Sequence, residues 1–134
     1  MSVSVLVSNT GAHDSAVTVQ VYCSFLDAPR VRIVRFAQTL CGFTKVFLRA
    51  GQKTEATVDV ALSTLARWDS RTTSVDLLGR TVPGAYVIDA GKWSVRVGDC
   101  SGAGVAAGYA SPLPCDQQRA EFQLDRSISF CGAA

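Results

Sequence analysis

The side chains with the most evident chemistry in this sequence are five cysteines, at positions 23, 41, 100, 115 and 131. None of them forms a C-x-x-C pair, and the single histidine, His13, does not stand at zinc-finger spacing, so we predict no metal site. Cys100 and Cys115 bracket a loop rich in glycine, alanine and proline. Closing such a loop with a disulfide contributes about 3 kcal/mol through the unfolded state. We therefore predict a Cys100–Cys115 bond.

Cys23 and Cys41 are the candidates for a second disulfide, which would leave Cys131 in the C-terminal tail. The sequence does not fix the connectivity, and five reduced thiols are the alternative. Because disulfides persist mainly in oxidising compartments, the oxidised pattern indicates an extracellular protein. The first residues lack a basic segment followed by an unbroken apolar run, so no signal peptide is predicted. The chain is then either intracellular or, as we expect, part of a larger secreted chain or assembly.

No residue pattern in the chain requires a catalytic explanation. His13, Asp14 and Ser15 are adjacent, whereas the members of a catalytic triad converge from separate parts of a fold. The aspartates at positions 69, 89 and 99 lie at expected turns, where such side chains bond the local backbone. They do not indicate the acid and base of a glycosidase. We predict that the chain is not an enzyme.

Residues 102–107 match the loose dinucleotide fingerprint G-x-G-x-x-A. That fingerprint binds a cofactor only where it joins a strand to a helix in a βαβ unit. Pro112 and Pro114 follow instead, so we interpret the segment as a loop between strands and predict no cofactor.

Two tryptophans could stack on a sugar ring. Trp93 shares its strand face with Val95 and Val97, which predicts a core position. Trp68 is expected to cover one end of the fold as a lid. Its alternative role is glycan stacking, which would make the chain a carbohydrate-binding module.

The composition is that of one folded domain without a strongly charged partner. Apolar residues make up 48% and charged residues 18%, and the net charge is +2. This balance excludes an electrostatic argument for nucleic acid. No apolar run has the length of a membrane span, so no membrane insertion is predicted.

Alternating apolar residues between glycine and proline turns predict about seven short strands and almost no helix. The two runs that flank Asn9-Thr10-Gly11, residues 3–7 and 17–25, predict a hairpin. Residues 62–69 are the one helical candidate. The pattern is typical of an all-β, antiparallel, immunoglobulin-like sandwich. We assign residues 1–126 to this domain and residues 127–134 to a tail.

Five segments follow one another in an informative order: VLVSNTG, AVTVQVYCS, LCGFTKVFLRAGQ, ATVDVALSTLARWD and GKWSVRVGDCS. Their order and spacing resemble the fibronectin type III-like domain at the C-terminal end of family 3 glycoside hydrolases, the β-glucosidases and β-xylosidases. The match covers residues 3–101. Within it, Phe43 and Leu48 have the character of core residues flanking a turn, and Gly51 suits a positive φ.

The resemblance implies an accessory β-sandwich without activity of its own, because the catalytic domains of that family are absent. Its partners would be other protein domains or chains, with glycan as the alternative. The family domain also has one more strand before the Asn-Thr-Gly strand. We therefore expect Val3, Val5 and Val7 to lie on an interaction edge, which a partner chain or the tail segment 127–130 could cover.

Overall fold

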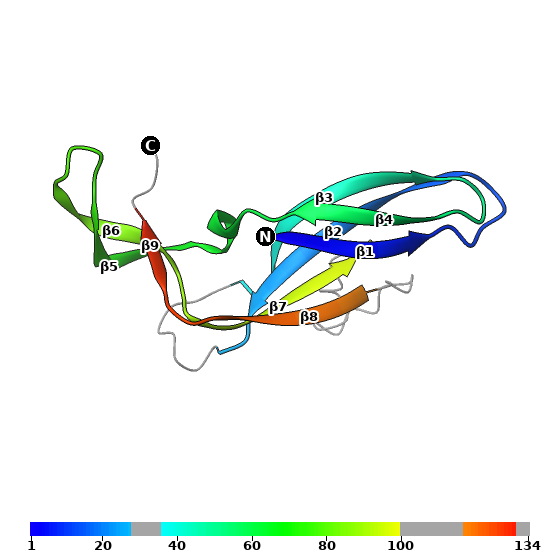
Figure 1. Ribbon diagram of the computed structural model, residues 1–134. Helices are drawn as coiled ribbons and strands as arrows, with labels where there is room; N and C mark the ends of the chain where they lie inside the picture. The colour runs from blue at the N-terminus through cyan, green and yellow to red at the C-terminus, as the bar shows by residue number, and fades with distance from the viewer. Residues whose placement is uncertain (28–35, 100–116, 131–134) are drawn as a thin grey trace.

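The computed structural model describes residues 1–27, 36–99 and 117–130, and these residues form almost nothing but β-strands (Figure 1). Within these ranges one short 3-10 helix, η2 (Leu62–Leu65), covers the first half of the predicted helical segment. The all-β prediction is confirmed, with nine strands in the described ranges rather than about seven. They are β1 (Ser2–Ser8), β2 (Ser15–Phe25), β3 (Thr39–Leu48), β4 (Lys53–Asp59), β5 (Arg67–Val75), β6 (Thr81–Ile88), β7 (Gly91–Gly98), β8 (Gln117–Leu124) and β9 (Ile128–Phe130).

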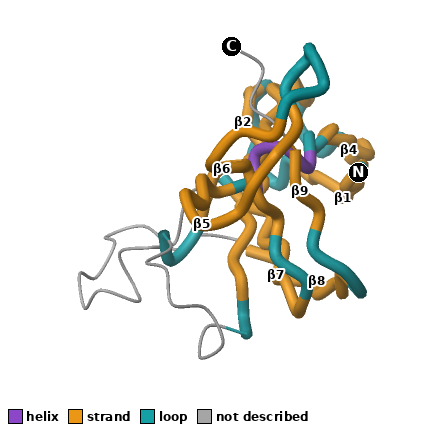
Figure 2. Tube along the Cα trace, turned by 90° about the vertical axis from the view of Figure 1, so that its left-hand side faces the viewer, coloured by secondary structure: helices purple, strands orange, loops and turns teal. Residues whose placement is uncertain are grey.

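The nine described strands form three antiparallel sheets. A two-stranded sheet, β1-β4, lies against a four-stranded sheet of order β3-β2-β7-β8, and β4 rests on β3. The third sheet, β5-β6-β9, stands at one end of this sandwich, in front of it when the molecule is viewed along its length (Figure 2).

The core lies between the two-stranded sheet and the four-stranded sheet and is built from alternate residues of their strands. Val19, Val21 and Cys23 of β2 meet Val58 of β4 there, and all four are at most 4% exposed. Trp93 is 3% exposed, which confirms its predicted core position. Its ring contacts Phe25 edge-on at 4.9 Å between centroids and stacks on Phe122 at 6.3 Å.

The predicted hairpin at Asn9-Thr10-Gly11 is wrong, because β1 and β2 belong to different sheets. β1 pairs with β4, and β2 pairs with β3 and β7. Hydrogen bonds of Asn9 explain why the chain passes from one sheet to the other between β1 and β2. The side-chain amide of Asn9 donates to the carbonyls of His13, Leu48 and Arg49. These bonds tie the loop to the β3–β4 turn, so the chain is led across the sandwich instead of folding back on itself.

A bulge in β3 interrupts its alternation. The register with β2 shifts between Val21 and Tyr22, and Cys41 is left without an opposite residue. Cys41 is buried, and a Cβ on Gly42 would lie 2.8 Å from Val58 Cγ1. Two successive residues of β3 therefore face the core.

The tail segment does not add to β1, contrary to the expectation that it could. β9 pairs with β6, in a register that places Phe130 opposite Tyr86, and their rings stack at 5.9 Å. Just before β9, Ser127 Oγ accepts a hydrogen bond from the Ala90 amide. Ring stacking and this bond hold the segment to the third sheet.

The close approach at Gly42 predicts that Gly42→Ala destabilises the fold by about 1–3 kcal/mol, because the added methyl group has no room against β4. The exposed-loop variant Ala12→Ser is the control and should change stability by less than about 0.5 kcal/mol. Urea unfolding measures both. Equal midpoints for Gly42→Ala and the parent would contradict the packing described for the bulge.

Candidate functional site

The sandwich is open along one side of β1. In the described residues β1 pairs with β4 and with no other strand. A groove of about 610 Å³ runs along its unpaired side, between the β1-β4 sheet and the four-stranded sheet. Val5 and Val7 of β1, Val17 and Val19 of β2, and Val97 of β7 line it.

The hydrogen-bond pattern shows which backbone groups of β1 face this open side. Met1 and Val60 exchange two backbone hydrogen bonds, at 3.1 and 2.7 Å, and the backbone N–H of Asn9 donates to the Gln52 carbonyl at 2.9 Å. Since such pairs recur every second residue in an antiparallel ladder, Val3, Val5 and Val7 are the positions bonded to β4. The intervening residues, Ser2, Ser4, Leu6 and Ser8, direct their N–H and C=O groups to the free side.

The predicted edge residues, Val3, Val5 and Val7, therefore lie on one strand beside its open side, where they contribute side chains and not free backbone groups. The valine side chains pack against the core from the border of the groove. The backbone groups that no other described strand pairs belong to their serine and leucine neighbours. A row of free donors and acceptors beside an apolar groove is a site for strand addition.

Nothing in the described ranges assembles a catalytic centre. His13, Asp14 and Ser15 stay in the β1–β2 loop and at the start of β2, and Asp14 accepts a hydrogen bond from the Ala50 amide. The same ranges hold no group of three or more metal-binding side chains. None of their helices is long and apolar enough to cross a bilayer.

Cys23 and Cys41 lie together in the core as free thiols, 2% and 6% exposed. A hydrogen bond with Cys23 lowers the pKa of Cys41 to about 7, while the same bond and burial raise the pKa of Cys23. Cys23 and Cys41, the candidates for a second disulfide, are thus adjacent free thiols in this structure. Cys100, Cys115 and Cys131 lie outside the described residues, and the Cys100–Cys115 bond stays a prediction.

Trp68 does not cover the core as a lid. It lies on β5, is 52% exposed, and meets Tyr86 edge-on at 5.2 Å. Gly84, at φ 87°, makes room for it, since a Cβ there would lie 2.0 Å from the indole. Arg67 next to it donates two hydrogen bonds to Asp89, at 2.9 and 3.0 Å. Trp68 thus belongs to a half-exposed aromatic group on the third sheet.

The expectation that Phe43 is a core residue is wrong, whereas Leu48 is buried as expected. Phe43 is 67% exposed on the outer face of β3, and Leu48 is 4% exposed. The bulge at Cys41 reverses the face of the residues that follow it. The signal available in the sequence was Gly42, whose missing side chain permits two successive inward positions.

Comparisons with known proteins agree with this geometry. A family model described as "Fibronectin type III-like domain" matches residues 17–101. An exo-α-(1→6)-L-arabinopyranosidase of Bifidobacterium breve is 31% identical over 101 residues, 75% of this chain and 11% of that protein. A probable β-glucosidase E of Aspergillus clavatus is 39% identical over 70 residues, 52% of this chain and 7% of that protein.

Solved structures give the same result. A β-glucosidase from Kluyveromyces marxianus superimposes with a TM-score of 0.69 and 26% identity, over 96% of this chain and 13% of that one. A GH3 β-glucosidase from Bifidobacterium adolescentis gives a TM-score of 0.66 and 29% identity, over 92% of this chain and 14% of that one. The chain thus spans a small part of each of these relatives.

The family model covers more than half of the chain, and the chain folds as the corresponding part of those enzymes does. This protein belongs to the fibronectin type III-like domain family, in the form carried by GH3 glycosidases.

Proposed function

We propose that the chain is a non-catalytic accessory module of a family 3 glycoside hydrolase, and that it packs against other protein segments through the open side of β1. The observation that carries the proposal is the groove beside a strand whose alternate backbone groups have no strand partner among the described residues. Buried backbone groups are almost always paired in folded proteins. A segment that fills this groove must therefore satisfy them, and an extended strand does so most simply.

The groove favours a protein segment over a small polar ligand. Its valine lining offers apolar surface to alternate side chains of an added strand, while the backbone of Ser4 and Leu6 offers a ladder. Each ladder bond contributes about 0.5–1.5 kcal/mol net. The partner is expected in the rest of a long polypeptide, because the relatives devote most of their length to other domains. An extracellular enzyme of this kind would also suit the predicted Cys100–Cys115 disulfide.

The test is a graft into the Bifidobacterium adolescentis β-glucosidase. The segment that this chain matches is deleted in one version and replaced by this chain in another. We expect the deletion to lower soluble yield and thermal stability, and the graft to restore both together with aryl glucoside hydrolysis. The isolated chain should hydrolyse no aryl glucoside or xyloside.

A proline variant tests the open edge within that graft. Leu6→Pro removes an outward N–H and leaves the bonds to β4 in place, so the grafted enzyme should lose stability while Leu6→Ala keeps it. A graft no better than the deletion, or a deletion as stable as the native enzyme, would contradict the accessory role. So would turnover by the isolated chain that a single Asp→Asn change removes.

Carbohydrate binding is the second candidate, favoured by the exposure of Trp68 beside Tyr86. An exposed indole face contributes a stacking platform for a sugar ring. Asp69 follows Trp68 on β5, and alternation along the strand directs its carboxylate to the side of Arg67, 3.4 Å away. Ring stacking on Trp68 would therefore have to carry the binding.

Tryptophan fluorescence tests this candidate, because Trp93 is buried and a ligand-dependent change reports on Trp68. If the candidate function holds, cello- and xylo-oligosaccharides shift the emission of the parent, and Trp68→Ala abolishes the shift. Phe43→Ala, which removes an exposed aromatic ring elsewhere, serves as the control. No shift at millimolar sugar would remove this candidate.

A further inference from the structure

The outer face of β3 carries an apolar stripe that neither the core nor the groove uses. We define the β3 stripe as Leu40, Phe43 and Phe47, which are 46%, 67% and 72% exposed. β3 is an edge strand of the four-stranded sheet. Exposed apolar groups scattered singly are ordinary, whereas several gathered on one strand face indicate an interaction surface.

The bulge gathers these residues on one face. Cys41 and Gly42 both face the core, so Leu40 before them and Phe43 after them face outward. Alternation then places Phe47 on the same side. The residues opposite Phe43 and Phe47 on β2 are Gln20 and Ala16, which are too small or too polar to cover the rings.

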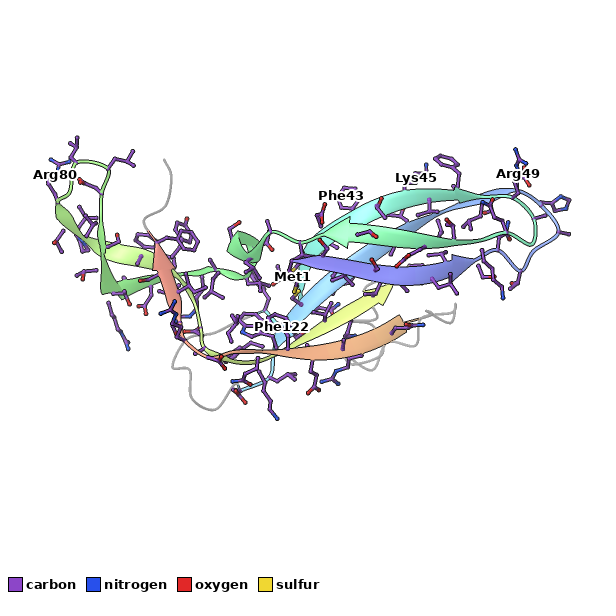
Figure 3. The ribbon with its side chains drawn as sticks, viewed as in Figure 1. Met1, Phe43, Lys45, Arg49, Arg80 and Phe122 are labelled. Atoms are coloured by element: carbon purple, nitrogen blue, oxygen red, sulfur yellow. The ribbon has the colours of Figure 1, made fainter. Side chains whose placement is uncertain are left out.

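The stripe is positively charged at its centre. Lys45 lies between the two phenylalanines, with its Nζ 5.3 Å from the centroid of the Phe47 ring. Phe43 and Lys45 lie along the outer side of β3, and Arg49 lies just beyond its end (Figure 3). No acidic residue occurs within β3. A lysine on an edge strand opposes the pairing of that edge with another strand, so recognition is expected through the side-chain face.

Charge also selects the kind of partner. Contact between two copies across a two-fold axis at the centre of the stripe would bring Lys45 against its own equivalent, which is repulsive. A different surface, with apolar side chains and a carboxylate facing Lys45, fits both features. Two buried phenylalanines supply on the order of 300–500 Å², a substantial part of an inter-domain interface of about 600–1,500 Å².

We propose that the β3 stripe docks onto a second domain of the same glycosidase polypeptide, at an apolar patch that carries a carboxylate. The large share of the relatives' length that lies outside this chain provides such domains. The stripe and the groove lie on opposite faces of the four-stranded sheet, so the module would be held from both sides. The inference rests on the accessory role proposed above.

The experiment uses the grafted Bifidobacterium adolescentis enzyme with the double variant Phe43→Ser/Phe47→Ser. The matched control is Leu77→Ser/Leu78→Ser, which removes two residues that are 104% and 76% exposed in the β5–β6 turn. We expect the stripe variant to inactivate at least about tenfold faster on heating, the rate change of a 1.4 kcal/mol loss. The control should stay within about twofold of the parent graft. In the isolated chain both variants should keep the parental unfolding midpoint, because exposed side chains contribute little there.

A charge reversal tests the predicted carboxylate. Lys45→Glu should accelerate inactivation of the graft, and Lys45→Arg, which keeps the charge, should not.

The outcomes separate this inference from the function on which it rests. A graft no better than the deletion contradicts both. A working graft whose stripe variant inactivates at the parental rate contradicts the docking surface alone, as does a control variant that loses as much. A parental chain that sediments as a dimer, with the stripe variant as a monomer, would identify a second copy as the occupant and overturn the proposal.

Discussion

The part of the chain that the structure describes depends on one imbalance, because two strands cover one face of a sheet that has four. β1 and β4 lie over the inner face of β3-β2-β7-β8, and the valine-lined groove begins where β1 ends the smaller sheet. Backbone groups that no strand pairs must be met by water or by another segment. The open side of β1 thus leaves backbone groups of the isolated chain without a strand partner, and the same groups determine which kind of segment the chain can bind.

The bulge at Cys41 and Gly42 affects both faces of the four-stranded sheet. On the inner face it brings Cys41 to Cys23 and lets β3 approach Val58. On the outer face it turns Leu40 and Phe43 toward solvent. One irregularity in the ladder therefore supports the core contact with the smaller sheet and also produces the apolar stripe.

Sequence alternation predicted the strand-rich fold and the buried Trp93, because these depend on local pattern, whereas the family was predicted from a resemblance in the order and spacing of five segments. It could not predict the partner of each strand. The Asn9 turn signal is the same for a hairpin as for a crossing between sheets, and only the carbonyls it reaches on the β3–β4 turn distinguish the two. Phe43 and Leu48 were both expected in the core, but they stand five positions apart on one strand, and alternation places them on opposite faces. The pairing of β9 depends on Tyr86, 44 positions before Phe130, which no local pattern encodes.

Amide hydrogen exchange along β1 tests the central claim most directly. In the isolated chain, the amides of Val3, Val5 and Val7 should be protected by β4, and those of Ser4, Leu6 and Ser8 should exchange fast. In the grafted enzyme all six should be protected, because a strand of the host fills the open side. Outward amides that are already protected in the isolated chain, or that still exchange fast in the graft, would contradict the account.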